Sequence, residues 1–407
     1  MTDHHARPRA RVHDVDALRG FALLGIFLVN ITFMASGYPG NLVTDPAYAT
    51  PLDDLVRDLS SVFVDMKFYV LFSFLFGYSF TLQMESAAAA GAAFEPRMLR
   101  RIAGLFALGV AHIVFLYGGD VLTTYALACL VLFWMRRCRD STALRVAGAL
   151  YGVVLASMLL AGLFVDPSAV LPSTDEALRE ARRSTAAMLG GWGDVVAGHL
   201  DGLPLLILQA VSLQGPTALA MFLLGMVAGR RQLLARVRGD EPILRRVQWI
   251  GFPVGLAGGL IYTLGGGNGH TLTVAVSVAT APALAAAYVA TLLRLMHHPR
   301  TAWIRSALAP AGRIALTNYL GQSAIGLLIF TGVGLGAAGR LSPPETLLLA
   351  LVVYLLQLAA SALWLRRFRY GPAEWLLRWV TIGHRPRWRN EVPVTARRAG
   401  SPAADRT

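Results

Sequence analysis

The chain has little that could hold a soluble fold together or identify a familiar reaction. Only 15% of its 407 residues are charged, and a single lysine, Lys67, stands among 37 basic side chains. The two cysteines, Cys129 and Cys138, form neither a disulfide framework nor a zinc-ligand pattern, so we expect no metal. The signatures of zinc proteases, α/β-hydrolases and P-loop proteins are also missing. Fold class must therefore be predicted from hydropathy.

Apolar residues dominate what is present. They make up 55% of the chain, too many for a soluble domain with so little charged surface to cover them. A bilayer core requires about 20 apolar residues per helix, and several stretches approach that length. We predict an all-α, polytopic transmembrane helix bundle of about ten spans. The spans cover residues 18–38, 61–84, 102–118, 121–135, 144–165, 205–229, 247–264, 272–293, 314–333 and 346–365.

Arginines are concentrated in alternate connections between these stretches. They precede the first stretch and follow the second, fourth, sixth, eighth and tenth. Because basic loops stay on the cytoplasmic side, the pattern predicts an inner or plasma membrane protein with both termini cytoplasmic. Topology thus explains the net charge of +13, and we expect no nucleic-acid partner. The basic, tryptophan-containing segment 368–388 is suited instead to anionic lipid head groups at the bilayer surface.

The predicted spans divide the chain into two membrane halves. We predict five helices in residues 1–165 and five in 205–390, the latter with an interfacial aromatic and basic segment. Residues 166–204 form an extracytoplasmic loop with a polar helix, and residues 391–407 a disordered tail. The two halves show no convincing sequence match. Pro216 frees a backbone carbonyl in the sixth span and is expected to bend it.

Charged side chains within apolar spans are costly, so each is a candidate functional residue. Asp16 and Arg19 share one helix face and are expected to pair, either as a topology anchor or around a ligand phosphate. Asp65 and Lys67 are expected just inside the outer end of the second span. Two residues apart on a helix, they do not face each other, so each requires its own partner or serves as an interfacial anchor.

His112 and Asn30 are predicted to lie at similar depth. Each follows an arginine by eleven residues (Arg101 and Arg19), which places both about 17 Å further into the bilayer, in its outer half. The alternative role of a buried histidine is a hydrogen bond between helices. The tight hairpin after His112, expected at the outer surface, carries Tyr117, Asp120, Thr123, Thr124 and Tyr125.

Asparagine and glutamine side chains complete the polar set inside the predicted spans. They serve either as contacts between helices or as substrate ligands, and the residue types alone do not distinguish these roles. The set comprises Asn318 and Gln322 in the ninth span, Gln357 in the tenth, and Gln209 and Gln214 in the sixth.

Five motifs, in order along most of the chain, resemble those of the YeiB-like family of bacterial membrane proteins. The first opens the first span and reads VDALRGFALLGIFLVNI from residue 15. The others include KF with LFSFLFG in residues 67–77, His112 with GDVL and YAL in residues 119–127, GRIALTNYL with QS in residues 312–323, and GPAEWLLR in residues 371–378. The resemblance implies a multi-pass membrane protein with a C-terminal domain of unknown function.

The first motif is also similar, more distantly, to that of heparan-alpha-glucosaminide N-acetyltransferase and related transmembrane acyltransferases. This similarity implies transfer of an acyl group from cytoplasmic acyl-CoA to an acceptor beyond the membrane. The chain departs from that relative because residues 39–60, its first outer loop, contain no histidine. His112 would then have to act as the base.

We therefore hypothesise an acyltransferase that uses acyl-CoA as co-substrate and acylates a hydroxyl of a cell-envelope glycan, lipid or secreted small molecule. The alternative is a transporter or exporter that uses His112, Asp120 and Lys67 within the membrane. The catalytic candidates are His112, Asp120 and Asn30; the acyl-CoA candidates are Asp16, Arg19 and Arg313; and the substrate candidates are Asp65, Lys67, Tyr117, Tyr125, Asn318 and Gln322.

Overall fold

The predicted all-α fold is confirmed. A computed structural model describes residues 6–390 except residues 92, 167–171 and 238, so the predicted tail at 391–407 lies outside the described residues. Within the described ranges every regular element is a helix, and the only extended pairing is a single bridge between Phe368 and Arg389.

The helices form two groups along the chain, one up to α6 and one from α8 onward. The first group comprises α1 (Ala6–Ala35), η1 (Pro39–Asn41), α2 (Pro51–Phe63), α3 (Lys67–Ala89), α4 (Phe94–Phe115), α5 (Leu122–Met135) and α6 (Asp140–Phe164). The second comprises α8 (Thr174–Met188), α9 (Trp192–Asp201), α10 (Leu203–Gln209), η2 (Ala210–Gln214), α11 (Gly215–Arg230), α12 (Leu233–Val237), α13 (Glu241–Leu264), η3 (Gly267–Gly269), α14 (Thr271–His297), α15 (Trp303–Arg313), α16 (Ala315–Phe330), α17 (Pro343–Arg367) and α18 (Pro372–Ile382).

The chain is a multi-pass membrane protein. Eight helical segments of the described residues are long and apolar enough to cross a bilayer, while α5 and α16 are shorter apolar helices. Large apolar side chains face outward, as on the peripheral α6, where Val153, Leu163 and Phe164 are 69%, 65% and 79% exposed. An apolar surface of this kind is typical of helices that face a membrane. The predicted number of about ten crossings remains a prediction.

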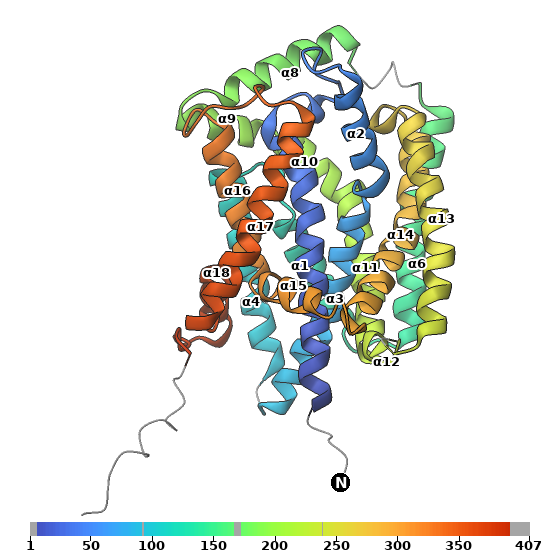
Figure 1. Cartoon of the computed structure of the whole chain (residues 1–407), viewed down its shortest axis with the longest axis vertical. Coiled ribbons are helices and arrows are strands. Elements are labelled where there is room, and N and C mark those ends of the chain that lie inside the picture. Colours follow the sequence, from blue (N-terminus) through green and yellow to red (C-terminus); the bar gives the residue numbers. More distant parts are fainter. Residues whose placement is uncertain (1–5, 92, 167–171, 238, 391–407) are drawn as a thin grey trace, which may run out of the picture.

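The two ends of the bundle differ. Helix α1 begins and α18 ends at one end, which we call the terminal end, whereas α8 and α9 cover the opposite end, the α8 end (Figure 1). The first and the last described helices therefore reach the same end, while the termini themselves lie outside the described residues. That this end faces the cytoplasm remains a prediction.

Glycines allow the central helices to cross closely. A Cβ added at Gly77 of α3 would lie 2.1 Å from the Phe222 carbonyl oxygen of α11, and one at Gly225 would lie 2.1 Å from the Phe74 carbonyl oxygen. Helix α1 crosses α15 in the same way, since a Cβ at Gly312 would lie 1.7 Å from the Asp16 carbonyl oxygen. Small residues are what allow membrane helices to approach this closely.

The prediction of an outer loop at residues 39–60 was wrong in its second half, because α2 begins at Pro51. Residues 51–63, expected mainly as loop, form α2, because Thr50 and Asp53 make a capping box and Pro51 occupies the first turn. Asp54 and Asp58 lie on the exposed polar side of this amphipathic helix, whereas Asp53 is buried in the capping box. The helix is then interrupted, and α3 begins at Lys67 after Met66, whose φ is +66°.

A second long helical segment is also interrupted. Residues from α9 to α11 form a 39-residue apolar segment, Trp192–Arg230, in which η2 is a π-helical turn just before Pro216. Tyr69 near the start of α3 donates a hydrogen bond to the Gln214 carbonyl in this turn at 2.6 Å. The two interruptions therefore face each other in the bundle.

Candidate functional site

His112 lies in the last turn of α4 and is almost completely buried, with 1% of its surface exposed. Its Nδ1 is 2.9 Å from Oδ1 of Asp120, which lies in the hairpin between α4 and α5. The other carboxylate oxygen accepts hydrogen bonds from the Thr123 backbone N–H at 2.7 Å and hydroxyl at 2.8 Å. One carboxylate oxygen of Asp120 thus orients the imidazole, while the other binds the first turn of α5.

The opposite ring nitrogen of His112 faces a serine on another helix. Nε2 is 2.8 Å from Oγ of Ser323 on α16, which is 1% exposed. A carboxylate only accepts hydrogen bonds, so Nδ1 carries the proton towards Asp120 and Nε2 is left to accept from the Ser323 hydroxyl. We call these three side chains the Ser323–His112–Asp120 chain. Its order of hydroxyl, base and orienting carboxylate is that of a nucleophile activated for covalent catalysis.

Aromatic rings, a close contact between α4 and α5, and α9 surround the Ser323–His112–Asp120 chain. The rings of Tyr319 and Tyr117 have centroids 5.1 and 6.2 Å from that of His112. A Cβ at Gly109 would lie 2.7 Å from the Thr123 nitrogen, so this glycine allows α5 to pack against α4. The hairpin, expected at the outer surface, is covered by α9: His199 donates from Nδ1 to the Val114 carbonyl at 3.3 Å.

The other candidates of the outer half do not join this chain. Asn30 is half-buried on α1 and makes no side-chain hydrogen bond within the described residues. Tyr125 lies 2.6 Å from the Ser73 hydroxyl, among aromatic rings on α3 and α11. It is therefore a core contact of α5, because its ring points to α3 instead of to α4.

Asn318 and Gln322 form a polar contact between α16 and α17. The Asn318 amide donates to the Ala311 carbonyl at 3.1 Å and to Ser361 at 2.9 Å. Gln322 donates to Gln357 at 3.0 Å, and Gln357 donates to the Asn318 carbonyl at 3.1 Å. This network fixes the helix that carries Ser323, which is the role in helix packing left open by the sequence.

Arginines gather towards the terminal end. The predicted ion pair between Arg19 and Asp16 is present at 2.6 Å, and Arg19 also donates to Ser79. Arg101 of α4 interacts electrostatically with Arg19 and Arg378, and also with the Glu374 carboxylate; we call the three arginines the arginine cluster. Arg101 is half-buried and makes no hydrogen bond or ion pair within the described chain.

Arg313 lies beside this cluster. Its charge acts on Asp16, although its own hydrogen bond goes to the Arg369 carbonyl at 3.0 Å. The sequence singled out Asp16, Arg19 and Arg313 as acyl-CoA candidates but did not single out Arg101 and Arg378, although Arg101 interacts electrostatically with both Arg19 and Arg378. Arg101 had served only as a marker of depth for His112, and nothing in the spacing links α18 to α4.

Glu374 of α18 holds the start of α16 in place. Its carboxylate accepts hydrogen bonds from the backbone N–H groups of Leu316 at 2.7 Å and Thr317 at 3.0 Å, and from the Thr317 hydroxyl at 2.5 Å. Burial raises the pKa of the Glu374 carboxyl, and the hydrogen bonds from Thr317 and Leu316 oppose that shift. A carboxylate in this place accepts hydrogen bonds from N–H groups that have no partner within the helix. Its negative charge also interacts favourably with the positive end of the helix dipole.

Replacing Glu374 with alanine is expected to destabilise the protein. Loss of the carboxylate leaves the N–H groups of Leu316 and Thr317 without partners in a half-buried site, at a cost of up to about 1–3 kcal/mol each. The matched control is Glu345→Ala, which removes a capping carboxylate from an exposed helix start at Ser342. Thermal unfolding in detergent should show a clearly larger drop in melting temperature for Glu374→Ala than for Glu345→Ala. Equal drops would contradict the role of Glu374 as a clamp on the start of α16.

Asp65 and Lys67 lie deeper than predicted. The ring of Phe68 packs against Gly25, midway along the apolar part of α1 (His13–Ala35), so the helix interruption is near the middle of the bundle. As expected, the two charges are not paired directly. Lys67 Nζ donates to the Ser61 carbonyl at 2.8 Å, and the Ser61 hydroxyl lies 3.3 Å from Asp65. The depth prediction failed because α2 extends the second span outward.

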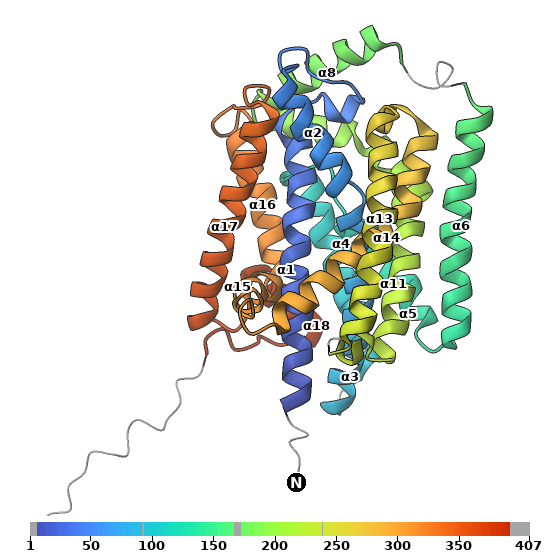
Figure 2. The same ribbon diagram turned by 45° about the vertical axis from the view of Figure 1, so that its right-hand side comes forward.

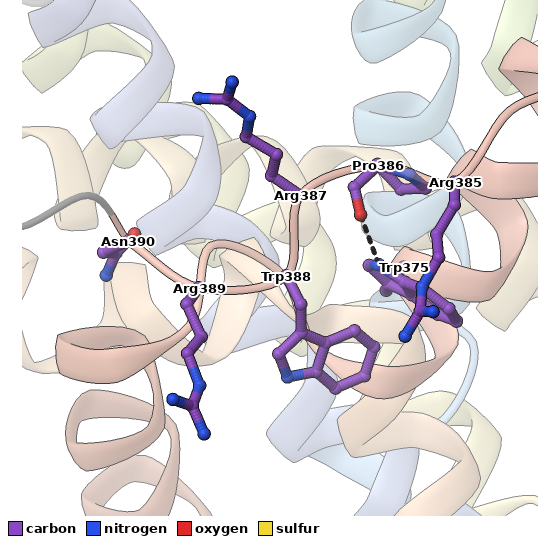
Figure 3. A pocket seen from close by; sticks show the side chains of 7 residues that line it. All are labelled: Trp375, Arg385, Pro386, Arg387, Trp388, Arg389 and Asn390. Carbon is purple, nitrogen blue, oxygen red and sulfur yellow. Dashed lines mark hydrogen bonds between the residues drawn. The ribbon is translucent and has the colours of Figure 1, made fainter.

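A surface hollow lies at the C-terminal edge of the described chain (Figure 3). It is a shallow depression of about 940 Å³ that is open to the surroundings, with Trp375, Trp388 and three arginines in its lining. Trp375 donates to the Pro386 carbonyl at 3.0 Å, and the Arg385 guanidinium lies 5.6 Å from the centre of the Trp375 ring. No group of three potential metal ligands occurs among the described residues.

Comparison with known proteins connects the chain to sequences without a described activity. Residues 228–384 match a family described as "Protein of unknown function (DUF418)". The chain is 30% identical to the "Uncharacterized protein YxaH" of Bacillus subtilis over 91% of its length and 94% of the relative's. It is 28% identical to the "Uncharacterized protein YeiB" of Escherichia coli, over 90% and 95% of the two chains. A Bacillus acidopullulyticus protein encoded near an amylase is similar to the same degree.

Proposed function

Because the chain belongs to the YeiB-like family of multi-pass membrane proteins, whose compared members carry no described activity, we propose its function from the site itself. We propose an integral membrane acyltransferase that moves an acyl group from acyl-CoA to a hydroxyl of a cell-envelope or secreted acceptor. One observation carries the proposal: the oriented imidazole of His112, with a hydroxyl 2.8 Å from its free nitrogen.

His112 acts as the general base. Asp120 fixes its tautomer and stabilises the imidazolium that forms when Nε2 takes a proton. A positioned base of this kind contributes about 10²–10⁴-fold to rate. We assign the amide of Asn30 as a donor to the thioester oxygen on which negative charge develops; Asn30 is not hydrogen-bonded to the Ser323–His112–Asp120 chain, and its side chain has no competing partner in the described chain. Gln322 has only one amide N–H left for that role, since the other is donated to Gln357.

The arginine cluster is placed to hold the phosphates of CoA. Arg101 and His112 are eleven residues apart on α4, which is about 17 Å along the axis and returns to the same helix face. An extended pantetheine arm can bridge such a distance. Guanidinium–phosphate hydrogen bonds would then anchor the donor at the terminal end, with its thioester beside His112.

Binding of acyl-CoA tests this placement. Acetyl-CoA and longer acyl-CoAs should raise the melting temperature of the purified protein, with a stabilisation of about 2.7 kcal/mol at a hundred times Kd. Arg101→Ala should weaken binding about tenfold or more, because a hydrogen bond to a charged group contributes about 1.5–3 kcal/mol.

The matched control for that experiment is Arg145→Ala. Arg145 is an exposed arginine of α6 whose hydrogen bond returns to its own helix, at the Ser141 carbonyl. Its replacement should leave acyl-CoA affinity unchanged. Equal affinity in the Arg101 and Arg145 variants would refute the cluster as the phosphate site, and no stabilisation of the parent protein by any acyl-CoA would refute the donor.

The helix interruption supports a second candidate function, transport. Discontinuous helices near the middle of the membrane, with a buried charge at the break, are typical of substrate and ion sites in transporters. Lys67 is completely buried and has two further N–H donors that could bind an anion. Solute flux in proteoliposomes that is lost in Lys67→Met, without acyl-CoA binding, would favour transport over acyl transfer.

We further propose the location and lipid contacts of the chain. The terminal end faces the cytoplasm of an inner or plasma membrane, because arginine-rich connections resist translocation. The hollow of Figure 3 then lies at the cytoplasmic head-group layer, where its arginines attract anionic lipids and its tryptophans reside in the interface.

A further inference from the structure

We propose that Ser323 is the first acceptor of the acyl group, so that transfer proceeds through an acyl-serine intermediate. This inference rests on the proposed acyltransferase function and adds a covalent residue to it. Oγ of Ser323 lies 2.8 Å from Nε2 of His112. It therefore occupies the position that the hydroxyl of an external acceptor would need.

The hydrogen bonding of Ser323 differs from that of other hydroxyl residues in these helices. A serine or threonine inside an apolar helix ordinarily donates to a carbonyl one turn earlier in its own helix. Ser212 and Thr331 do so at 2.7 and 2.8 Å, and Ser157 donates to a carbonyl three residues back at 2.8 Å. The corresponding distance from Ser323 to the Tyr319 carbonyl is 3.5 Å, too long for a good O–H···O bond. The Ser323 proton is therefore directed at His112.

The chemical step balances within the residues present and the donor. Oγ of Ser323 attacks the thioester carbon as its proton moves to Nε2 of His112, and a C–O bond forms. The C–S bond then breaks, and the CoA sulfur leaves with the proton from Nε2. In the second half, the acceptor hydroxyl gives its proton to Nε2 and attacks the ester, and Ser323 recovers that proton as it leaves.

A covalent intermediate suits the position of the site. The donor's phosphates are assigned to the terminal end, whereas His112 lies towards α9 at the α8 end. An acyl group held on Ser323 lets CoA depart before an acceptor arrives from the opposite end. Burial of Ser323 also protects the ester, because water is excluded until the acceptor enters.

Exchange of CoA tests the intermediate without knowledge of the acceptor. The full-length protein in detergent is mixed with unlabelled acyl-CoA and isotopically labelled CoA, using acyl chains from acetyl to palmitoyl. A covalent intermediate transfers label into acyl-CoA in the absence of any acceptor. Ser323→Ala should reduce exchange by about a thousandfold or more, as expected for loss of a nucleophile.

Two further variants make the test specific to Ser323. Ser323→Cys should accumulate an acyl adduct on the peptide containing residue 323, released by neutral hydroxylamine because it is a thioester. Ser157→Ala, which removes a serine bonded only to its own helix, should exchange at the parent rate. Exchange that persists in Ser323→Ala, or a parent protein that binds acyl-CoA without exchange or adduct, would overturn the inference. Failure of acyl-CoA to bind at all would instead refute the proposed function.

Discussion

Replacement of His112 with alanine is expected to abolish acyl transfer while leaving the protein folded in the membrane. The imidazole is the one base within hydrogen-bond distance of the Ser323 hydroxyl among the described residues, and its loss should reduce turnover by about 10³-fold or more. The measurement is acyl-CoA-dependent acylation of membranes or of an added acceptor, with protein abundance determined in parallel.

A second variant keeps this result interpretable. Alanine at residue 112 leaves the buried Asp120 without one of its partners, which by itself costs stability. His112→Asn retains an amide N–H for Asp120 but provides no base, so it should be as inactive as His112→Ala and more stable. His199→Ala alters a histidine at the same hairpin and should keep activity. An active His112→Asn protein would contradict the assignment of His112 as base.

Alanine at Gly77 is expected to prevent correct assembly of the bundle. The added Cβ would meet the Phe222 backbone oxygen at 2.1 Å, and Gly225 would meet the Phe74 oxygen equally closely one turn further on. Backbone atoms cannot move aside as a flexible side chain can, so the helices must separate. We expect a loss of at least about 1–3 kcal/mol for either variant, with much lower membrane abundance and melting temperature.

Glycines of α6 provide the matched control. A Cβ at Gly148 or Gly152 meets nothing within 4 Å, and alanine is a better helix former than glycine. Gly148→Ala and Gly152→Ala should therefore match or exceed the parent in heated size-exclusion assays. If Gly77→Ala behaves like these controls, the close crossing of α3 and α11 is not what holds the centre of the bundle together.

Hydropathy and charge were sufficient to predict the helical membrane fold. The apolar runs give the long helices, and the capping box at Thr50 with Pro51 was present in the sequence as a signal for α2. It was overlooked because the spans were predicted from long apolar runs, and residues 39–60 were assigned to an outer loop. The interruption before Lys67 was not predicted, since Val64 and Met66 carry no turn signal; in the structure the start of α3 is hydrogen-bonded through Tyr69 to the Gln214 carbonyl of η2.

The candidate site was predicted in part. His112 and Asp120 lie eight residues apart on one hairpin, so their hydrogen bond follows from local geometry. Ser323 lies 211 residues from His112, and its role depends on how α16 packs against α4. A single sequence contains no spacing rule that joins residues of different helices. Arg101 escaped for the same reason, because its neighbours Arg19 and Arg378 come from α1 and α18.

The clamp formed by Glu374 has a consequence for the alignment of the reacting atoms. Glu374 holds helix α16 at Thr317. Ser323 follows six residues later on the same helix, about 9 Å along its axis. A slip of 1 Å at the clamp moves Oγ of Ser323 by a similar amount, and errors of that size can cost about 10²-fold in rate. Helix α18, which carries Glu374, therefore fixes the position of Ser323. Substitutions that loosen its contact with α16 should reduce turnover before they unfold the protein.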